Sequence, residues 1–145
     1  MFSPNLLKIM GIRLATEYAN RKQHPEEKLW KAVVATAFED VICKLGSKIE
    51  TYRKKEAHDW FLSGSKDFEH VCYLAGLEPD SVAYRYRLLL RKKIIFFTEL
   101  QKEWVNYKEE YISYRSAKNK TERREILSQI DLIKNRIIKK KAGSR

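Results

Sequence analysis

The stretch DFEHVCYLAGLEPDSVAYRYR, residues 67–87, decides the fold of this chain. It has the spacing of two short helices joined by a tight turn: a small residue, a glycine four positions later, an apolar residue directly after the glycine, and a β-branched residue six positions after it. These positions hold Cys72, Gly76, Leu77 and Val82. We therefore predict a helix-turn-helix within residues 66–93, with Ser65 capping its first helix and Pro79 in the first turn of its second.

The second helix of this motif carries the candidate binding residues. If Val82 and Tyr86 face the core, the opposite side of the helix presents basic and polar side chains. Arginine can hold guanine or a phosphate with paired donors, and tyrosine and serine can hydrogen-bond to phosphates or base edges. We predict that this helix enters the major groove of double-stranded DNA and contacts it through Ser81, Ala83, Tyr84, Arg85, Arg87, Arg91 and Lys92.

Two features of the motif leave another interpretation open. A glycine between two short helices also occurs in αα-corners that bind no nucleic acid. Glu78 and Asp80 lie at the start of the second helix, where phosphate would repel a carboxylate. We expect one of these carboxylates to cap the helix, rather than to accept a hydrogen bond from a cytosine amino group.

Three further helices are predicted before the motif. They run from Pro4 to about Asn20, from Pro25 to Gly46, and from Ser47 to Ser63. Proline suits a first helical turn because that turn needs no backbone N–H, and glycine suits a helix end. Ser47 and Glu50 have the spacing of a capping box. These helices would form the scaffold that positions the motif.

Residues 94–145 are predicted to form a helical hairpin with a basic tail, its helices at about 94–115 and 121–141. Apolar and aromatic side chains recur at three or four positions, as in a helix packed along another helix. They are Phe97, Leu100, Trp104, Tyr107 and Tyr111, and then, after a polar gap, Ile126, Ile130, Ile133 and Ile137. We expect this stripe to serve packing within the chain or across a homodimer, rather than stacking on single-stranded bases.

The charge of the chain favours a polyanionic partner. The 145 residues include 30 Lys and Arg against 19 Asp and Glu, a formal net charge of +11. A single basic triplet is typical of a solvated face, but three triplets on one basic chain favour a nucleic-acid surface. Two of them, residues 53–55 and 91–93, flank the motif in sequence. We predict that Arg53, Lys54, Lys55 and Lys66 contact the DNA backbone. The third triplet is residues 139–141.

Other functional classes lack sequence support. No apolar run approaches the ~20 residues of a membrane span, and no secretion signal is evident, so we expect a cytoplasmic, nucleoid-associated protein without a membrane partner. Cys43, Cys72, His58 and His70 do not have the spacing of a zinc site. No phosphate-binding glycine loop or nucleophile motif is present. We therefore expect no metal, no cofactor, no catalytic residue and no enzymatic activity.

A resemblance supports the motif. The segments AHDWFLS (57–63), DF (67–68) and VCYLAGLEPDSV (71–82) follow a shared pattern of Trp-Phe-x-Ser, then Phe-x-x-Val-Cys-x-x-x-Gly-Leu-Asp-Pro, then an arginine-rich helix. In this pattern, residues 56–90 resemble small uncharacterised bacterial and phage proteins. The resemblance implies a helix-turn-helix in phage-like or mobile-element settings, and implies no activity. These proteins commonly carry arginine where Ala83 stands, so the contact made by that arginine is not carried over to this chain.

Together these features predict an all-α protein with a DNA-binding domain at 1–93 and a packing or dimerisation arm at 94–145. The expected function is sequence-specific DNA binding, with transcriptional regulation of bacterial or phage type as its use. The alternative is a helical interaction protein, either an adaptor in phage assembly or DNA packaging or a partner of RNA polymerase, that does not read DNA sequence.

Overall fold

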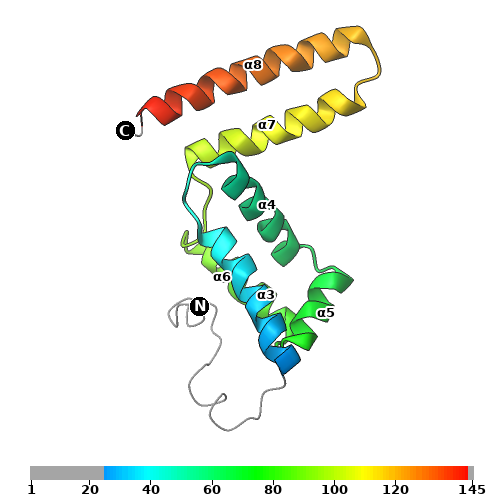
Figure 1. Ribbon diagram of the computed structural model, residues 1–145, viewed down its shortest axis with the longest axis vertical. Coiled ribbons are helices and arrows are strands. Elements are labelled where there is room, and N and C mark those ends of the chain that lie inside the picture. The colour runs from blue at the N-terminus through cyan, green and yellow to red at the C-terminus, as the bar shows by residue number, and fades with distance from the viewer. Residues whose placement is uncertain (1–24, 144–145) are drawn as a thin grey trace. The chain divides into compact units, whose positions relative to one another are not determined.

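The computed structural model describes residues 25–143, which form six α-helices and no strand (Figure 1). The predicted all-α fold is therefore confirmed for this part of the chain. The helix predicted from Pro4 to Asn20 lies outside the described residues. The helices are α3 (Pro25–Ile42), α4 (Lys48–Leu62), α5 (Lys66–Leu74), α6 (Pro79–Arg91), α7 (Glu99–Ser116) and α8 (Lys120–Gly143).

The chain forms two compact units whose division does not follow chain order. Of the described residues, 25–43 and 53–96 belong to the first unit, and 44–52 and 97–143 belong to the second. The sequence predicted one boundary after residue 93. The segment before and at the start of α4 belongs instead with the C-terminal helices. Gln101 donates a hydrogen bond to the Leu45 carbonyl at 3.0 Å, and the Trp104 indole donates one to the Gly46 carbonyl at 2.9 Å.

The core of the first unit is formed where apolar faces of α3, α4, α5 and α6 meet. Aromatic rings fill its centre: Phe61 stacks on Tyr86 with ring centroids 4.6 Å apart, and meets Phe38 edge-on at 6.4 Å. Offset and edge-on ring pairs stabilise a core beyond the area they bury. The buried cluster consists of Val34, Phe38, Val41, Ala57, Phe61, Phe68, Val71, Cys72, Ala75, Val82, Tyr86, Leu89 and Ile95.

Local capping signals set several helix starts as the sequence predicted. The Ser65 hydroxyl accepts a hydrogen bond from the Phe68 backbone N–H at 3.1 Å and caps α5. The Ser47 hydroxyl accepts from the Glu50 N–H at 3.3 Å and donates to the Glu50 carboxylate at 2.9 Å. Pro79 occupies the first turn of α6.

The predicted helix start at residue 94 is wrong. Lys93 adopts a left-handed conformation with φ +56°, and α7 begins only at Glu99. Between them Ile95, 2% exposed, is buried in the core of the first unit. Thr98 and Gln101 then form a capping box, because each side chain hydrogen-bonds to the backbone of the other residue. Phe97 therefore precedes α7 and does not belong to its apolar stripe.

In the second unit, α7 and α8 run side by side in opposite directions (Figure 1). Ile130, Ile133 and Ile137 of α8 are buried, whereas Ile126 is half-buried. The buried Glu103 of α7 forms ion pairs with Arg136 at 3.1 Å and Lys140 at 2.8 Å. Burial raises the pKa of Glu103, but the hydrogen bonds from Lys140 and Arg136 outweigh it, and the net pKa is lowered. Packing between the two helices is thus both apolar and ionic.

No helix within residues 25–143 combines the length and the apolar character needed to cross a membrane.

Candidate nucleic-acid interface

The turn between α5 and α6 is built around Gly76. Its φ of +71° is in the left-handed region that glycine tolerates best. The Gly76 N–H donates to the Tyr73 carbonyl at 3.0 Å, and the Leu77 N–H donates to the Cys72 carbonyl at 2.8 Å. These bonds satisfy carbonyl groups at the end of α5. A Cβ atom at Gly76 would also collide with the carboxylate of Glu27 on α3. The backbone conformation is therefore the main reason for glycine here, because the end of the Glu27 side chain could move aside.

Helix α6 has one buried and one exposed face. Val82, Tyr86 and Leu89 face the core, with at most 7% of each residue exposed. Ala83 is half-buried, whereas the remaining residues predicted to contact DNA are exposed: Ser81, Tyr84, Arg85, Arg87, Arg91 and, directly after the helix, Lys92. Lys66, at the start of α5, is also exposed. The structure thus places these predicted contacts at the surface of the first unit.

A polar contact that the sequence did not indicate anchors the inner side of α6. The Tyr86 hydroxyl lies 2.6 Å from Nδ1 of His58 on α4. Burial lowers the pKa of His58, and Lys55 lowers it further, so the neutral ring is favoured. Burial also raises the pKa of Tyr86, and its hydroxyl stays protonated. The hydroxyl can therefore donate to the neutral imidazole. These residues are 28 positions apart, and no local pattern pairs them.

The expected capping by a carboxylate is not found at Glu78. Glu78 is the N-cap residue of α6, but its side chain makes no capping hydrogen bond. Asp80 lies in the first turn, where its charge interacts favourably with the positive end of the helix. Both residues are exposed, so the candidate DNA face begins with two negative charges.

The three residues of the basic triplet at 53–55 lie in different environments. Arg53 is exposed, and Lys55 is half-buried and forms an ion pair with Asp59 at 2.9 Å. Lys54 is only 1% exposed, and its ammonium group donates to the carbonyls of Cys43 at 2.7 Å and Phe96 at 2.6 Å. The prediction that Lys54 contacts DNA is wrong, because its charge is buried and solvated by backbone carbonyls. In the third triplet, Lys140 is bound to Glu103.

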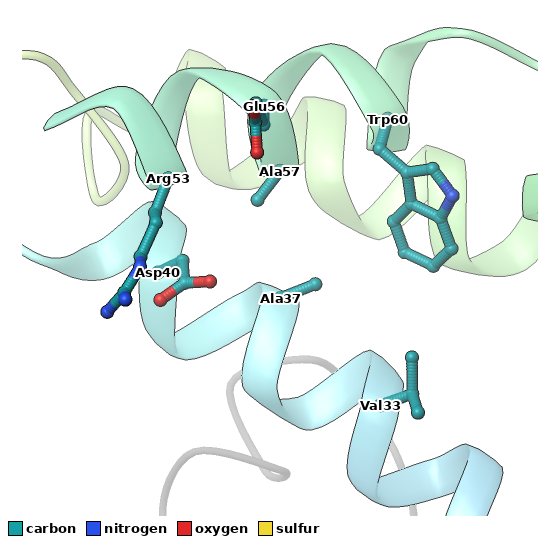
Figure 2. Close-up of a pocket in the computed structure, with 7 residues that line it drawn as sticks. All are labelled: Val33, Ala37, Asp40, Arg53, Glu56, Ala57 and Trp60. Atoms are coloured by element: carbon teal, nitrogen blue, oxygen red, sulfur yellow. The ribbon is translucent and has the colours of Figure 1, made fainter. Parts of the chain in front are cut away.

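A groove of about 310 Å³ lies between α3 and α4 in the first unit (Figure 2). Figure 2 shows Arg53 and Asp40 at one end and Trp60 and Val33 at the other. Burial raises the pKa of Asp40, and the charge of Arg53 opposes that shift. The groove is mainly apolar and includes only Arg53 among the predicted site residues. No three His, Cys, Asp or Glu side chains in residues 25–143 gather closely enough to bind a metal ion.

The residues of the predicted packing arm lie in several surroundings in the second unit. Trp104, Tyr107 and Tyr111 are half-buried on α7, with ring centroids of neighbouring pairs 5.6 and 4.9 Å apart. A Cβ atom at Gly46 would meet the side chain of Leu100, so these residues are in close contact. These side chains are thus partly covered within the second unit. A homodimer through these helices stays a prediction.

Comparison of the chain with protein-family models, curated proteins and solved structures finds no match. The resemblance of residues 56–90 to small bacterial and phage proteins therefore stays a prediction. The geometry of α5 and α6 and the charges they carry are the features that bear on function.

Proposed function

We propose that this chain is a sequence-specific DNA-binding protein in which α6 enters the major groove. The observation that carries the proposal is the division of α6 into a core face and a solvent face. Val82, Tyr86 and Leu89 fix one face, and Arg85, Arg87 and Arg91 project from the rest of the helix. None of these three arginines forms an ion pair with a carboxylate within residues 25–143. Their donors are therefore available to an external ligand.

The residue types on this face suit both parts of DNA recognition. Paired donors on arginine match the acceptor atoms of guanine in the major groove, and also match phosphate oxygens. Tyr84, on the same helix, is 57% exposed. Glu78 and Asp80 would be repelled by phosphates but can accept a hydrogen bond from the amino group of cytosine. The start of α6 is thus suited to base edges, and its later turns are suited to guanine or phosphate.

We propose transcriptional regulation, of bacterial or phage type, as the use of this binding. A homodimer through the second unit would present two copies of α6, as palindromic sites one helical turn apart require. The test is selection of genomic DNA fragments at near-physiological salt, followed by binding assays on the selected site. Arg85→Ala/Arg87→Ala should no longer bind this site, whereas Arg123→Ala/Arg124→Ala, an equal charge change on exposed residues of α8, should retain it.

A second candidate function is a helical interaction protein without DNA specificity. It is favoured by large apolar side chains on the surface of the second unit: Ile112, Leu127, Leu132 and Ile138, which are 41–64% exposed. Exposed apolar patches often mark protein contacts. Selection that enriches no DNA sequence, together with a change of assembly state in Leu127→Ser/Ile138→Ser, would favour this candidate over DNA recognition.

A further inference from the structure

Lysine ammonium groups and tyrosine rings form one continuous surface on the second unit. We call Lys48, Tyr52, Tyr107, Lys108 and Tyr111 the lysine–tyrosine surface; it is built by the first turns of α4 and the middle of α7. The Lys48 ammonium lies 5.9 Å from the centroid of the Tyr52 ring and 5.6 Å from that of Tyr107. The Lys108 ammonium lies 4.9 Å from the Tyr52 centroid. Two positive charges therefore share the ring of Tyr52.

In the part of the chain that the structure describes, no carboxylate pairs with either of these two charges. Within residues 25–143, neither Lys48 nor Lys108 forms an ion pair, and Glu109 and Glu110 on α7 contact neither ammonium. Other carboxylates of the second unit are engaged elsewhere: Glu50 by Ser47, Glu99 by Lys102, and Glu103 by Arg136 and Lys140. Both charges approach the same ring, and contact with ring faces compensates only part of the repulsion between like charges. A bound anion would relieve it.

The tyrosines supply donors beside the ammonium groups. A hydrogen bond with Tyr111 and burial together raise the pKa of Tyr107 to about 12. Burial also raises the pKa of Tyr52, with a smaller effect from Tyr111. Their hydroxyls therefore stay protonated at neutral pH, and both side chains are half-buried rather than enclosed. The single proton of Tyr107 is engaged with Tyr111, so Tyr52 supplies the hydroxyl donor of this surface. A group of ammonium and hydroxyl donors without a carboxylate acceptor suits an anion with several oxygens, such as a phosphate.

The positions of the lysines also distinguish phosphate binding from base stacking. Single-stranded bases stack on free aromatic faces. Here the faces of Tyr52 and Tyr107 are already approached by lysine ammonium groups. The ligand is therefore expected to contact the lysine ammonium groups and the tyrosine hydroxyls rather than the ring faces. A phosphodiester backbone meets this requirement, and the excess of 13 basic over 7 acidic residues in 94–145 favours such a polyanion.

We propose that the lysine–tyrosine surface binds the phosphodiester backbone of nucleic acid without reading base sequence. This site is separate from α6, and it stands whether or not α6 recognises a DNA site. It gives the second unit a role of its own in nucleic-acid affinity, in addition to packing.

The test compares two double variants of the full chain that lose the same charge. Lys48→Gln/Lys108→Gln removes the charges of the surface, and Lys118→Gln/Lys120→Gln removes two exposed charges near the turn between α7 and α8. Binding is measured by fluorescence anisotropy across a range of salt concentrations, with a random-sequence duplex and with oligo-deoxythymidine as separate probes. Circular dichroism checks that each variant keeps its helix content.

We expect Lys48→Gln/Lys108→Gln to weaken binding about tenfold relative to the control pair. The slope of log affinity against log salt concentration should also become shallower, by about 0.9 for each phosphate that is no longer neutralised. Weaker binding of the duplex alone identifies a duplex backbone as the ligand, and weaker binding of oligo-deoxythymidine identifies a single strand. Equal affinities and slopes for the two double variants with both probes would overturn the proposal, as would an absence of binding by the unmodified chain.

Discussion

The ammonium group of Lys54 donates a hydrogen bond of 2.6 Å to the carbonyl oxygen of Phe96, a residue 42 positions later in the chain. It also donates to the Cys43 carbonyl at 2.7 Å. Cys43 and Phe96 are the last residues of the first unit before the chain enters the second. One buried lysine is thus hydrogen-bonded to both of these boundary residues of the first unit.

This arrangement predicts that Lys54→Met destabilises the protein strongly. The substitution keeps most of the side-chain volume but leaves two part-buried carbonyls without this donor, which costs about 1–3 kcal/mol of unfolding free energy. Lys55→Met is the control, because the ion pair of Lys55 with Asp59 is at the surface and contributes at most about 1 kcal/mol. Urea unfolding measures both. Equal stability of the two variants would contradict the role given to Lys54.

The turn between α5 and α6 predicts a difference between two glycines. Gly76 and Gly64 both have positive φ, +71° and +57°, so alanine strains the backbone at either position by about 1–2 kcal/mol. Only at Gly76 would the added methyl group collide with Glu27, because nothing lies within 4 Å at Gly64. That carboxylate is the end of a flexible side chain and can move at the cost of its ion pair with Lys31, so Gly76→Ala should lower the melting temperature only slightly more than Gly64→Ala. The reverse order would show that the packing of α3 on this turn is misassigned.

The contact between His58 and Tyr86 predicts a pH dependence of stability. The pKa of His58 is lowered in the folded state, so the unfolded chain binds more protons at mildly acidic pH. The stability contributed by the neutral ring is complete above the unfolded pKa of about 6.5, and it is lost as pH falls from there toward the folded pKa. His58→Gln should make the unfolding free energy depend less on pH across this range.

His70→Gln is the matched control for that measurement, since His70 is exposed on α5. Chemical unfolding of both variants and of the unmodified chain, repeated between about pH 5 and pH 7, separates the two histidines. An identical pH profile for His58→Gln and the unmodified chain would rule out the proposed effect of His58.

The sequence predicted the parts of the fold that depend on local chemistry. Ser47, Ser65 and Pro79 mark helix starts through hydrogen bonds or ring geometry within one turn. The break before α7 was missed because Lys93 carries no local signal for its positive φ. The spacing of Thr98 and Gln101, which form a capping box, could have located the start of α7.

The candidate site was predictable only where periodicity determines burial. The order Val82, Tyr86 and Leu89 indicates the inner face of α6, and its outer residues follow. Lys54 cannot be told from Arg53 or Lys55 by sequence, because carbonyls from distant segments decide its burial. The partner of His58 and the lysines over Tyr52 likewise depend on contacts between helices distant in sequence.

We propose that the exposed face of α6 recognises a DNA sequence. Measuring the affinity of variants for a selected DNA site tests this role. The affinity of Arg85→Ala/Arg87→Ala for a DNA site selected by the unmodified chain is compared with that of Arg123→Ala/Arg124→Ala. Each arginine that grips guanine contributes about 1–3 kcal/mol, so the first variant should bind at least about thirtyfold more weakly while its melting temperature stays unchanged. Equal affinities of the two variants for the selected site would contradict the assignment of α6 as a recognition helix.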